Sequence, residues 1–228
     1  MRQTFAFFVS LALAVGAAQA DPKKYKIKKV EEAVPNKLKA GIQKLFGNDA
    51  VQFKTADGEL IATFWFRKSI PVRAGKDEIK KGVTYKALND TEILGAVNFA
   101  QSWRDYRGQK ISKGIYTLRF GMQPQDGDHM GTSMHPEFCV LLSAKFDPKA
   151  GHLPPQEMAE RSAASIRRSH PAVFLLFPSK KAKGKELQLI APADEHVALT
   201  IERNVTAGGE ATDGKIGLVL AVVGRANE

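Results

Sequence analysis

Cysteine is almost absent from this 228-residue chain, in which Cys139 is the only one. A single thiol excludes a disulfide within the chain, so packing alone must stabilise the fold. A secreted eukaryotic domain would more often carry paired cysteines. If the chain is exported, we therefore expect a bacterial protein.

Long apolar runs are also missing, with one exception at the start of the chain. Arg2 is followed by an uncharged apolar run over residues 5–18 and by the small-x-small sequence Ala18-Gln19-Ala20. This order predicts a signal peptide over residues 1–20, cleaved after Ala20, and hence a periplasmic or secreted protein. A membrane span needs about 20 apolar residues, so an integral membrane protein is not expected. A lipoprotein is excluded because no cysteine lies at the cleavage site.

The net charge of +10 is concentrated in two short stretches. Eight lysines stand against three acids between Asp21 and Lys44, and four more lysines lie within residues 180–185. Neither stretch is a basic face with interleaved aromatic residues, so nucleic acid is not expected as a partner. Such charge can attract an anionic surface or an acidic polysaccharide of the cell envelope. Alternatively, the two stretches are a solubilising arm and a solvated loop.

Apolar alternation recurs in about ten short segments separated by turn signals. The clearest is a hairpin over residues 51–66, in which Asp57-Gly58 marks the turn. Helices are predicted only near residues 35–46 and 154–168, so regular crossover helices are missing. We therefore predict a mostly β fold, an antiparallel, jelly-roll-like β-sandwich with two short peripheral helices. Residues 21–47 are then a Lys-rich arm with a short helix, and residues 48–228 form the sandwich.

One segment gathers several metal-binding types of side chain. Residues 126–135 have the sequence Asp-Gly-Asp-His-Met-Gly-Thr-Ser-Met-His, and a cysteine follows. Imidazole, thiolate and thioether groups together favour copper. The candidate metal ligands are His129, His135, Cys139, Met130, Met134, Asp126 and Asp128. The pattern departs from cupredoxins, because residues 140–145 contain no histidine or methionine. Alternatively, the segment is a compact turn and the cysteine is a buried apolar residue.

The turn at residues 103–107, Trp-Arg-Asp-Tyr-Arg, is a second candidate site. Aromatic rings beside guanidinium groups can bind a planar or anionic ligand or stack on a sugar. The candidate ligand-binding residues are Trp103, Arg104, Tyr106 and Arg107. Alternatively, this turn folds over the edge of the core.

Catalytic motifs are missing: the chain has neither Gly-x-Ser-x-Gly nor His-Glu-x-x-His. Cys139 lies within the apolar residues 138–142, where burial would raise its pKa and reduce its reactivity. The sequence therefore favours a non-catalytic protein of the cell envelope that binds a ligand or carbohydrate or serves a structural role. The alternative is a copper-binding protein that uses residues 126–139.

Four short strings are distinctive: Trp103-x-x-Tyr106-Arg107, Gly-Ile-Tyr-Thr-Leu-Arg at residues 114–119, Asp-Gly-Asp-His-Met-Gly-Thr at 126–132 and His-Pro-Ala-Val at 170–173. Together they resemble a family of uncharacterised secreted proteins from planctomycete-type bacteria, over the chain from about residue 60 to its end. The resemblance implies a similar fold and an envelope location. It implies no activity and assigns no site residues.

Overall fold

The computed structural model describes residues 20–124, 127, 133–182, 184, 187–193 and 195–224. Residues 1–19 of the predicted signal peptide therefore lie outside the described residues. Within the described ranges, no helix combines the length and the apolar character needed to cross a bilayer.

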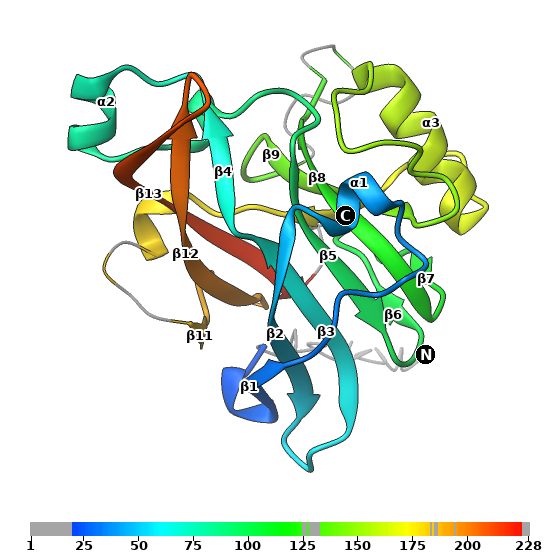
Figure 1. Cartoon of the computed structure of the whole chain (residues 1–228). Coiled ribbons are helices and arrows are strands. Elements are labelled where there is room, and N and C mark those ends of the chain that lie inside the picture. The colour runs from blue at the N-terminus through cyan, green and yellow to red at the C-terminus, as the bar shows by residue number, and fades with distance from the viewer. Residues whose placement is uncertain are drawn as a thin grey trace, which may run out of the picture.

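A seven-stranded antiparallel sheet forms one layer of the molecule (Figure 1). Its strands follow one another across the sheet in the order in which they occur in the chain. They are β1 (Tyr25–Glu31), β2 (Phe46–Thr55), β3 (Leu60–Arg67), β5 (Ile93–Phe99), β8 (Gly114–Met122), β9 (Glu137–Ser143) and β10 (Ala172–Leu175). The β2–β3 connection is a short turn, whereas the other connections are longer and carry, between them, one strand of the second sheet, the helices and a small hairpin.

A second sheet of four strands forms the other layer. Its strands are β4 (Ser69–Val72), β11 (Gln188–Ile190), β12 (Val197–Ala207) and β13 (Glu210–Val223). The hairpin of β12 and β13 is its centre, and β4 pairs with β12 in parallel. Two facing sheets around a shared core confirm the predicted antiparallel β-sandwich.

Helices and a small hairpin surround the two sheets. The hairpin pairs β6 (Trp103–Arg104) with β7 (Lys110–Ile111). The helices are α1 (Ala40–Gln43), α2 (Lys76–Lys81) and α3 (Pro155–Ile166), with 3-10 turns η1 (Pro22–Lys24), η2 (Tyr85–Ala87) and η3 (Ser179–Ala182). The helix predicted near residues 154–168 is confirmed as α3.

The large sheet is buried on both faces. Phe64 and Phe66 of β3 point into the main core between the two sheets, whereas Trp65 points into a separate cluster beneath α1. Near the other edge of the sheet, Met158 of α3 packs in a third cluster with Val140 of β9. Successive side chains of a strand point to opposite faces of the sheet, so neighbouring residues of β3 enter different clusters. Because both faces are buried, β3 is apolar along most of its length.

The N-terminal arm is part of the sandwich, which corrects the sequence-based expectation of a separate arm. β1 pairs with β2 along its whole length. The helix predicted over residues 35–46 shrinks to α1, because Phe46 already begins β2. Phe46 and Ile42 are both buried against Trp65, so packing overrides the helical periodicity of this segment.

Two side chains and one backbone group cover the outer edge of β13. Trp103 donates its Nε1–H to the carbonyl oxygen of Val222 at 2.8 Å. The hydroxyl of Tyr85 accepts the backbone N–H of Val219 at 3.0 Å, and Phe177 donates its N–H to the Val219 carbonyl at 2.9 Å. Exposed sheet edges invite pairing with other chains, so these contacts close an edge that would otherwise be open.

Replacing Tyr85 with phenylalanine should lower the free energy of unfolding by about 1–3 kcal/mol, because the buried Val219 N–H loses its acceptor. Tyr116→Phe is the matched control. Its hydroxyl donates to the carbonyl of the exposed Ser112, which water can satisfy. Urea unfolding followed by tryptophan fluorescence measures both losses. Equal losses would contradict a special role for Tyr85.

Candidate functional site

The predicted metal segment is described only in part. Asp126, Asp128, His129 and Met130 lie outside the described residues. Met134 is exposed. The structure therefore tests the copper hypothesis at His135 and Cys139, together with Met134.

Cys139 and His135 lie on opposite sides of the large sheet. Cys139 is buried in the main core between the sheets, and this burial raises the pKa of its thiol. The ring of His135 packs edge-on against Phe177, with 5.2 Å between ring centroids, and Phe177 belongs to the cluster beneath α3. A copper site that uses both side chains is therefore not formed. Among the described residues, no group of three or more His, Cys, Asp or Glu is placed to hold a metal ion.

The turn at residues 103–107 does not present an aromatic platform. Trp103 is half-buried and packs edge-on against Tyr25 and Phe53. Tyr106 is only 4% exposed, and its ring lies 6.0 Å from that of Phe138. Both aromatic residues therefore serve the core, contrary to the expectation that their rings meet a ligand. Of the four candidate ligand-binding residues, the two exposed ones are Arg104 and Arg107.

Asp105, at the centre of this turn, seals the edge of β10. Its Oδ2 accepts the backbone N–H of Val173 at 3.1 Å, and its Oδ1 accepts that of Gln109 at 2.7 Å. Tyr106 adds a backbone bond to the Val173 carbonyl at 2.8 Å. Burial raises the pKa of Asp105, while these N–H donors act in the opposite direction. The turn thus folds over the edge of the core, as the alternative interpretation predicted.

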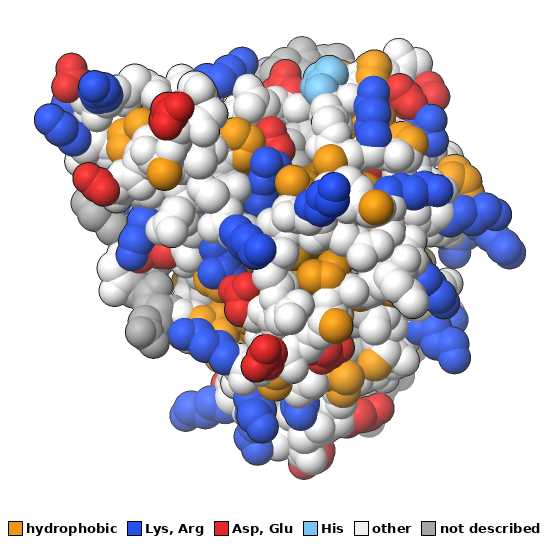
Figure 2. Space-filling view, viewed as in Figure 1, with side chains coloured by type: hydrophobic (Ala, Val, Ile, Leu, Met, Phe, Trp, Pro, Cys, Tyr) orange, Lys and Arg blue, Asp and Glu red, His pale blue; other side chains and the backbone are white. Residues whose placement is uncertain are grey.

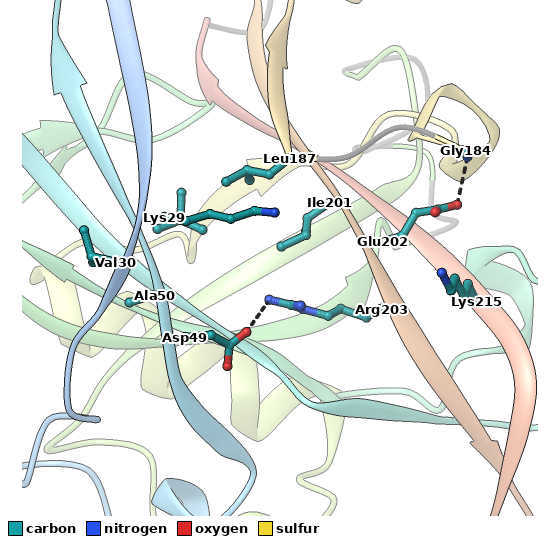
Figure 3. Close-up of a pocket in the computed structure, with 11 residues that line it drawn as sticks. Lys29, Val30, Asp49, Ala50, Gly184, Leu187, Ile201, Glu202, Arg203 and Lys215 are labelled. Carbon is teal, nitrogen blue, oxygen red and sulfur yellow. Dashed lines mark hydrogen bonds and ion pairs between the residues drawn. The ribbon is translucent and has the colours of Figure 1, made fainter.

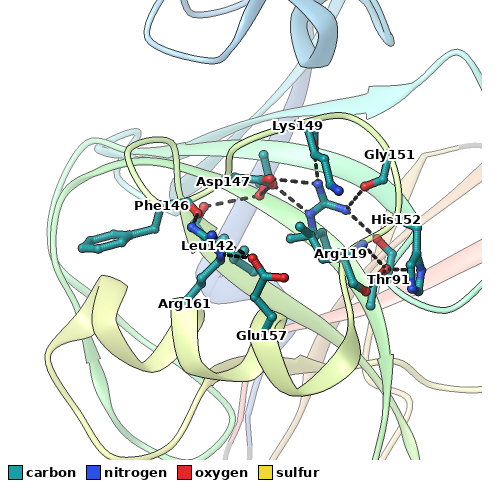
Figure 4. A network of polar contacts seen from close by, with 12 residues as sticks. Thr91, Arg119, Leu142, Phe146, Asp147, Lys149, Gly151, His152, Glu157 and Arg161 are labelled. Atoms are coloured by element: carbon teal, nitrogen blue, oxygen red, sulfur yellow. Dashed lines mark hydrogen bonds and ion pairs between the residues drawn. The ribbon is translucent and has the colours of Figure 1, made fainter.

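A buried ion pair organises a different part of the surface (Figure 4). Arg119 of β8 and Asp147 have fully buried side chains, and Nε and Nη2 of the arginine each lie 2.8 Å from a carboxylate oxygen. The remaining N–H groups of Arg119 donate to the carbonyl oxygens of Thr91, Gly151 and Lys149. All five guanidinium donors therefore have an acceptor.

This arrangement clamps two loops that are distant in the sequence. Thr91 lies in the loop before β5, whereas Asp147, Lys149 and Gly151 lie in the loop between β9 and α3. A buried charge is tolerated only when its hydrogen bonds are complete. The buried arginine thus fixes the two loops relative to each other, and we call this set of contacts the Arg119 clamp.

Thr91 occupies the left-handed region of backbone space, with φ = 62°. This conformation is unfavourable for a β-branched residue and persists only where the surroundings enforce it. The Thr91 hydroxyl donates to the Leu153 carbonyl at 2.9 Å and accepts the Leu153 N–H at 3.1 Å. Together with the Arg119 clamp, these bonds hold the strained residue in place. Such strain is concentrated at functional sites, which makes the neighbouring surface a candidate.

The neighbour of this strained residue is His152. Its Nδ1 lies 3.1 Å from the Thr91 hydroxyl and 3.3 Å from the Asp90 carbonyl oxygen. A carbonyl oxygen can only accept, and the Thr91 hydroxyl already donates to Leu153. Nδ1 must therefore carry the proton in the neutral ring, which leaves the lone pair on Nε2. His152 is exposed, so Nε2 can accept a hydrogen bond from a ligand.

A polar cavity of about 360 Å³ opens beside His152. It is lined by Arg73, Asn89, Asp90, Glu92, Ala150, Gly151 and His152. Glu92 is paired with Arg67 from β3, and Nη2 of Arg73 donates to the Leu88 carbonyl at 2.8 Å. We call this cavity the His152 pocket. It combines acceptors on the two loops that the Arg119 clamp holds in place with the side chain of Arg73, which follows β4.

Sequence reasoning missed this pocket, although β8 contains one signal. Tyr116, Leu118 and Phe120 face the main core, so Arg119 must face the opposite side of a sheet that is buried there too. A charged residue at a buried strand position needs a partner. Its acidic partner, however, lies 28 residues away in a loop.

Removing the acidic partner in Asp147→Ala should destabilise the protein by about 3–5 kcal/mol, because Arg119 would remain buried without its counter-charge. Glu157→Ala is the matched control. It breaks another Arg–carboxylate pair, to Arg161, in which both side chains are more than one-third exposed. We expect that loss to stay below about 1 kcal/mol. Chemical denaturation measures both values, and a small loss in Asp147→Ala would refute the clamp.

His135 should make the protein less stable in acid. Burial lowers its pKa below the ordinary 6.5; Lys181 acts in the same direction and Glu137 opposes it. The folded protein then binds this proton less tightly than the unfolded chain. The resulting stability is complete above pH 6.5 and is lost as the pH falls through the folded-state pKa. When the pH is lowered from about 7.5 to about 5, the urea midpoint of unfolding should therefore fall more in the wild type than in His135→Phe. An equal fall would contradict this.

Comparison with known proteins does not add a family to these observations. No protein-family model matches the sequence, and no curated protein or solved structure matches it significantly. The resemblance to secreted planctomycete-type proteins thus stays a prediction.

Proposed function

We propose that this protein is a non-catalytic binding protein of the bacterial envelope, and that the His152 pocket holds a small polyhydroxylated ligand such as a sugar unit. The observation that carries the proposal is the Arg119 clamp. It fixes two of the three segments that line the pocket, those around Thr91 and Gly151, before any ligand arrives. Polar groups that are already in position bind a ligand with a smaller loss of conformational entropy.

The chemistry of the lining residues suits hydroxyl groups. A sugar hydroxyl both donates and accepts hydrogen bonds, and the pocket offers partners of both kinds. Asp90 and Nε2 of His152 accept, Arg73 donates, and the amide of Asn89 does both. A volume of about 360 Å³ lies within the range of small-molecule sites. The lining residues include no aromatic ring, so we expect weak binding, with a Kd on the order of 1 mM.

Binding fits the pocket better than glycoside hydrolysis does. Most glycosidases need two carboxyl groups on either side of the scissile bond. The pocket has two carboxylates, but Glu92 is held by Arg67 of β3. The lining residues also include no serine, threonine or cysteine nucleophile. These features support a binding role for Asp90 and His152.

The proposal is tested by NMR titration of the exported protein with a panel of monosaccharides and envelope-derived oligosaccharides. At least one sugar should shift the resonances of His152 and of residues 89–92. His152→Ala and Asp90→Asn should each weaken that binding about tenfold or more, because each removes an acceptor that the ligand needs. His170→Ala is the matched control, since His170 is exposed and lies outside the pocket.

Two results would contradict the proposed function. One is the absence of saturable shifts at the His152 pocket with every sugar in the panel. The other is binding by His152→Ala that equals binding by the control variant. Metal analysis of the same preparation tests the copper alternative, for which residues 126–130 supply the untested ligands.

A further inference from the structure

The β6–β7 hairpin places two like charges directly opposite each other. Arg104 of β6 pairs across the hairpin with Lys110 of β7, and Trp103 pairs with Ile111. Trp103 and Ile111 pack in the main core, so Arg104 and Lys110 point to the outer face, where both are exposed. Like charges at directly opposed positions of a strand pair are destabilising. An anionic partner would turn this repulsion into a shared attraction.

A second basic segment lies beside this hairpin. Arg167 and Arg168 follow α3, and both are exposed. Arg167 ends the helix with φ = 56°, a left-handed conformation that glycine adopts at a lower cost. The loop then leads into β10, and the Gln109 side chain donates to the Pro171 carbonyl at 3.0 Å, which holds this loop against the hairpin. We call the exposed cations of the two segments the basic edge: Arg104, Arg107, Lys110, Arg167 and Arg168.

The cations of the basic edge have no acidic partner among the described residues. Nη1 of Arg104 donates to the Gly108 carbonyl at 2.7 Å, which leaves the charge of the arginine uncompensated. The Asp105 carboxylate belongs to the same turn, but it is buried and accepts the backbone N–H groups of Val173 and Gln109. An anion that approaches the exposed side of this edge therefore meets a favourable potential.

A cavity of about 470 Å³ between the two sheets offers a contrast (Figure 3). Arg203 of β12 lines this cavity, but its Nη2 donates to the Asp49 carboxylate at 3.2 Å, so its charge already has a partner. On the molecular surface, lysine and arginine side chains gather on the flank beside β7 and α3 (Figure 2). The basic edge thus differs from the cavity because its arginines have no counter-charge.

The composition of the basic edge indicates which anion it suits. Four of the five cations are arginines, whose planar guanidinium groups match the geometry of carboxylates. The cations are divided between two segments, which suits a chain with repeated charges better than a single small anion. Trp103 and Tyr106 pack in the core and offer no ring for stacking, which disfavours single-stranded nucleic acid.

An anionic membrane suits this edge less well. Proteins that lie on a membrane surface combine basic residues with apolar side chains that enter the interface. Among the described residues, the large apolar side chains that are exposed belong to Met122 and Met134. Met122 ends β8 and Met134 precedes β9, whereas the basic edge adjoins the starts of β8 and β10. The basic edge therefore has no apolar side chain of this size beside it for insertion into a membrane.

We propose that the basic edge binds an acidic polysaccharide whose repeating units carry carboxylate groups. The hairpin contacts one part of the sugar chain, and the loop after α3 contacts a neighbouring part. These cations lie outside the two lysine-rich stretches of the sequence. The surface is additional to the His152 pocket, which lies beside the other end of β8, and it does not depend on the function proposed for that pocket.

Biolayer interferometry with immobilised polygalacturonate tests the proposal, and immobilised dextran is the uncharged comparison. The exported protein should bind polygalacturonate and should not bind dextran. Raising the NaCl concentration from about 0.1 M to about 1 M should abolish the binding, because the Debye length falls from about 10 Å to about 3 Å and exposed charges are screened.

Two double variants test the two segments separately. Arg104→Gln with Lys110→Gln, and Arg167→Gln with Arg168→Gln, should each weaken polygalacturonate binding about tenfold, because each removes two contacting cations. The hairpin variant should unfold at a urea concentration no lower than that of the wild type, since it relieves a like-charge repulsion. A weaker affinity in this variant is then not a result of unfolding.

Lys80→Gln with Lys81→Gln is the matched control. It removes the same charge from exposed lysines of α2, which lies on the opposite side of the molecule from the hairpin (Figure 1). Polygalacturonate affinity should stay within about twofold of the wild type, because distant exposed charges are screened. His152→Ala should also leave this affinity unchanged, which separates the proposal from the function proposed above.

Three outcomes would overturn the proposal. The first is that either edge variant binds polygalacturonate as tightly as the α2 control variant. The second is that dextran binds as tightly as polygalacturonate. The third is that vesicles of phosphatidylglycerol bind the protein more tightly than polygalacturonate does, which would assign the basic edge to a membrane surface.

Discussion

Burying a charged side chain on the face of a sheet costs free energy unless every hydrogen-bonding group finds a partner. Arg119 and Asp147 meet this condition, because a carboxylate and three carbonyl groups from two loops converge on one guanidinium group. The positions of both loops follow from this requirement, and so do the strained Thr91 and the orientation of His152. The proposed function of the pocket therefore depends on complete hydrogen bonding around one buried guanidinium group.

A sandwich without disulfides has a second requirement, since its sheet edges must not pair with other chains. Asp105 and its turn occupy the edge of β10, and Trp103 and Tyr85 occupy that of β13. The sequence of the turn at residues 103–107 resembles a ligand site, because covering a sheet edge requires the same aromatic and charged side chains that bind ligands. β1, at the opposite end of the large sheet from β10, instead contacts β11 of the second sheet.

Much of the fold could be predicted from the sequence, because strands with a buried face show alternation that a local window reveals. β1 escaped notice because lysines dominate its composition, although Tyr25 and Ile27 alternate with charged residues. The pocket could not be predicted, since Arg119 and the loops it joins are ordinary in isolation and meet only in three dimensions. Nearness in sequence was equally misleading for Cys139 and His135, which the large sheet separates.

The parallel pairing of β4 with β12 has a consequence for how the molecule forms. Neighbouring strands of the large sheet are separated by much shorter stretches of chain than β4 and β12, so their pairing costs less chain entropy. Ser69 and Asn204, in contrast, meet across 135 residues. Contacts of such long range are slow to form. The second layer is thus complete only when β12 and β13, at residues 197–223, are available to join β4.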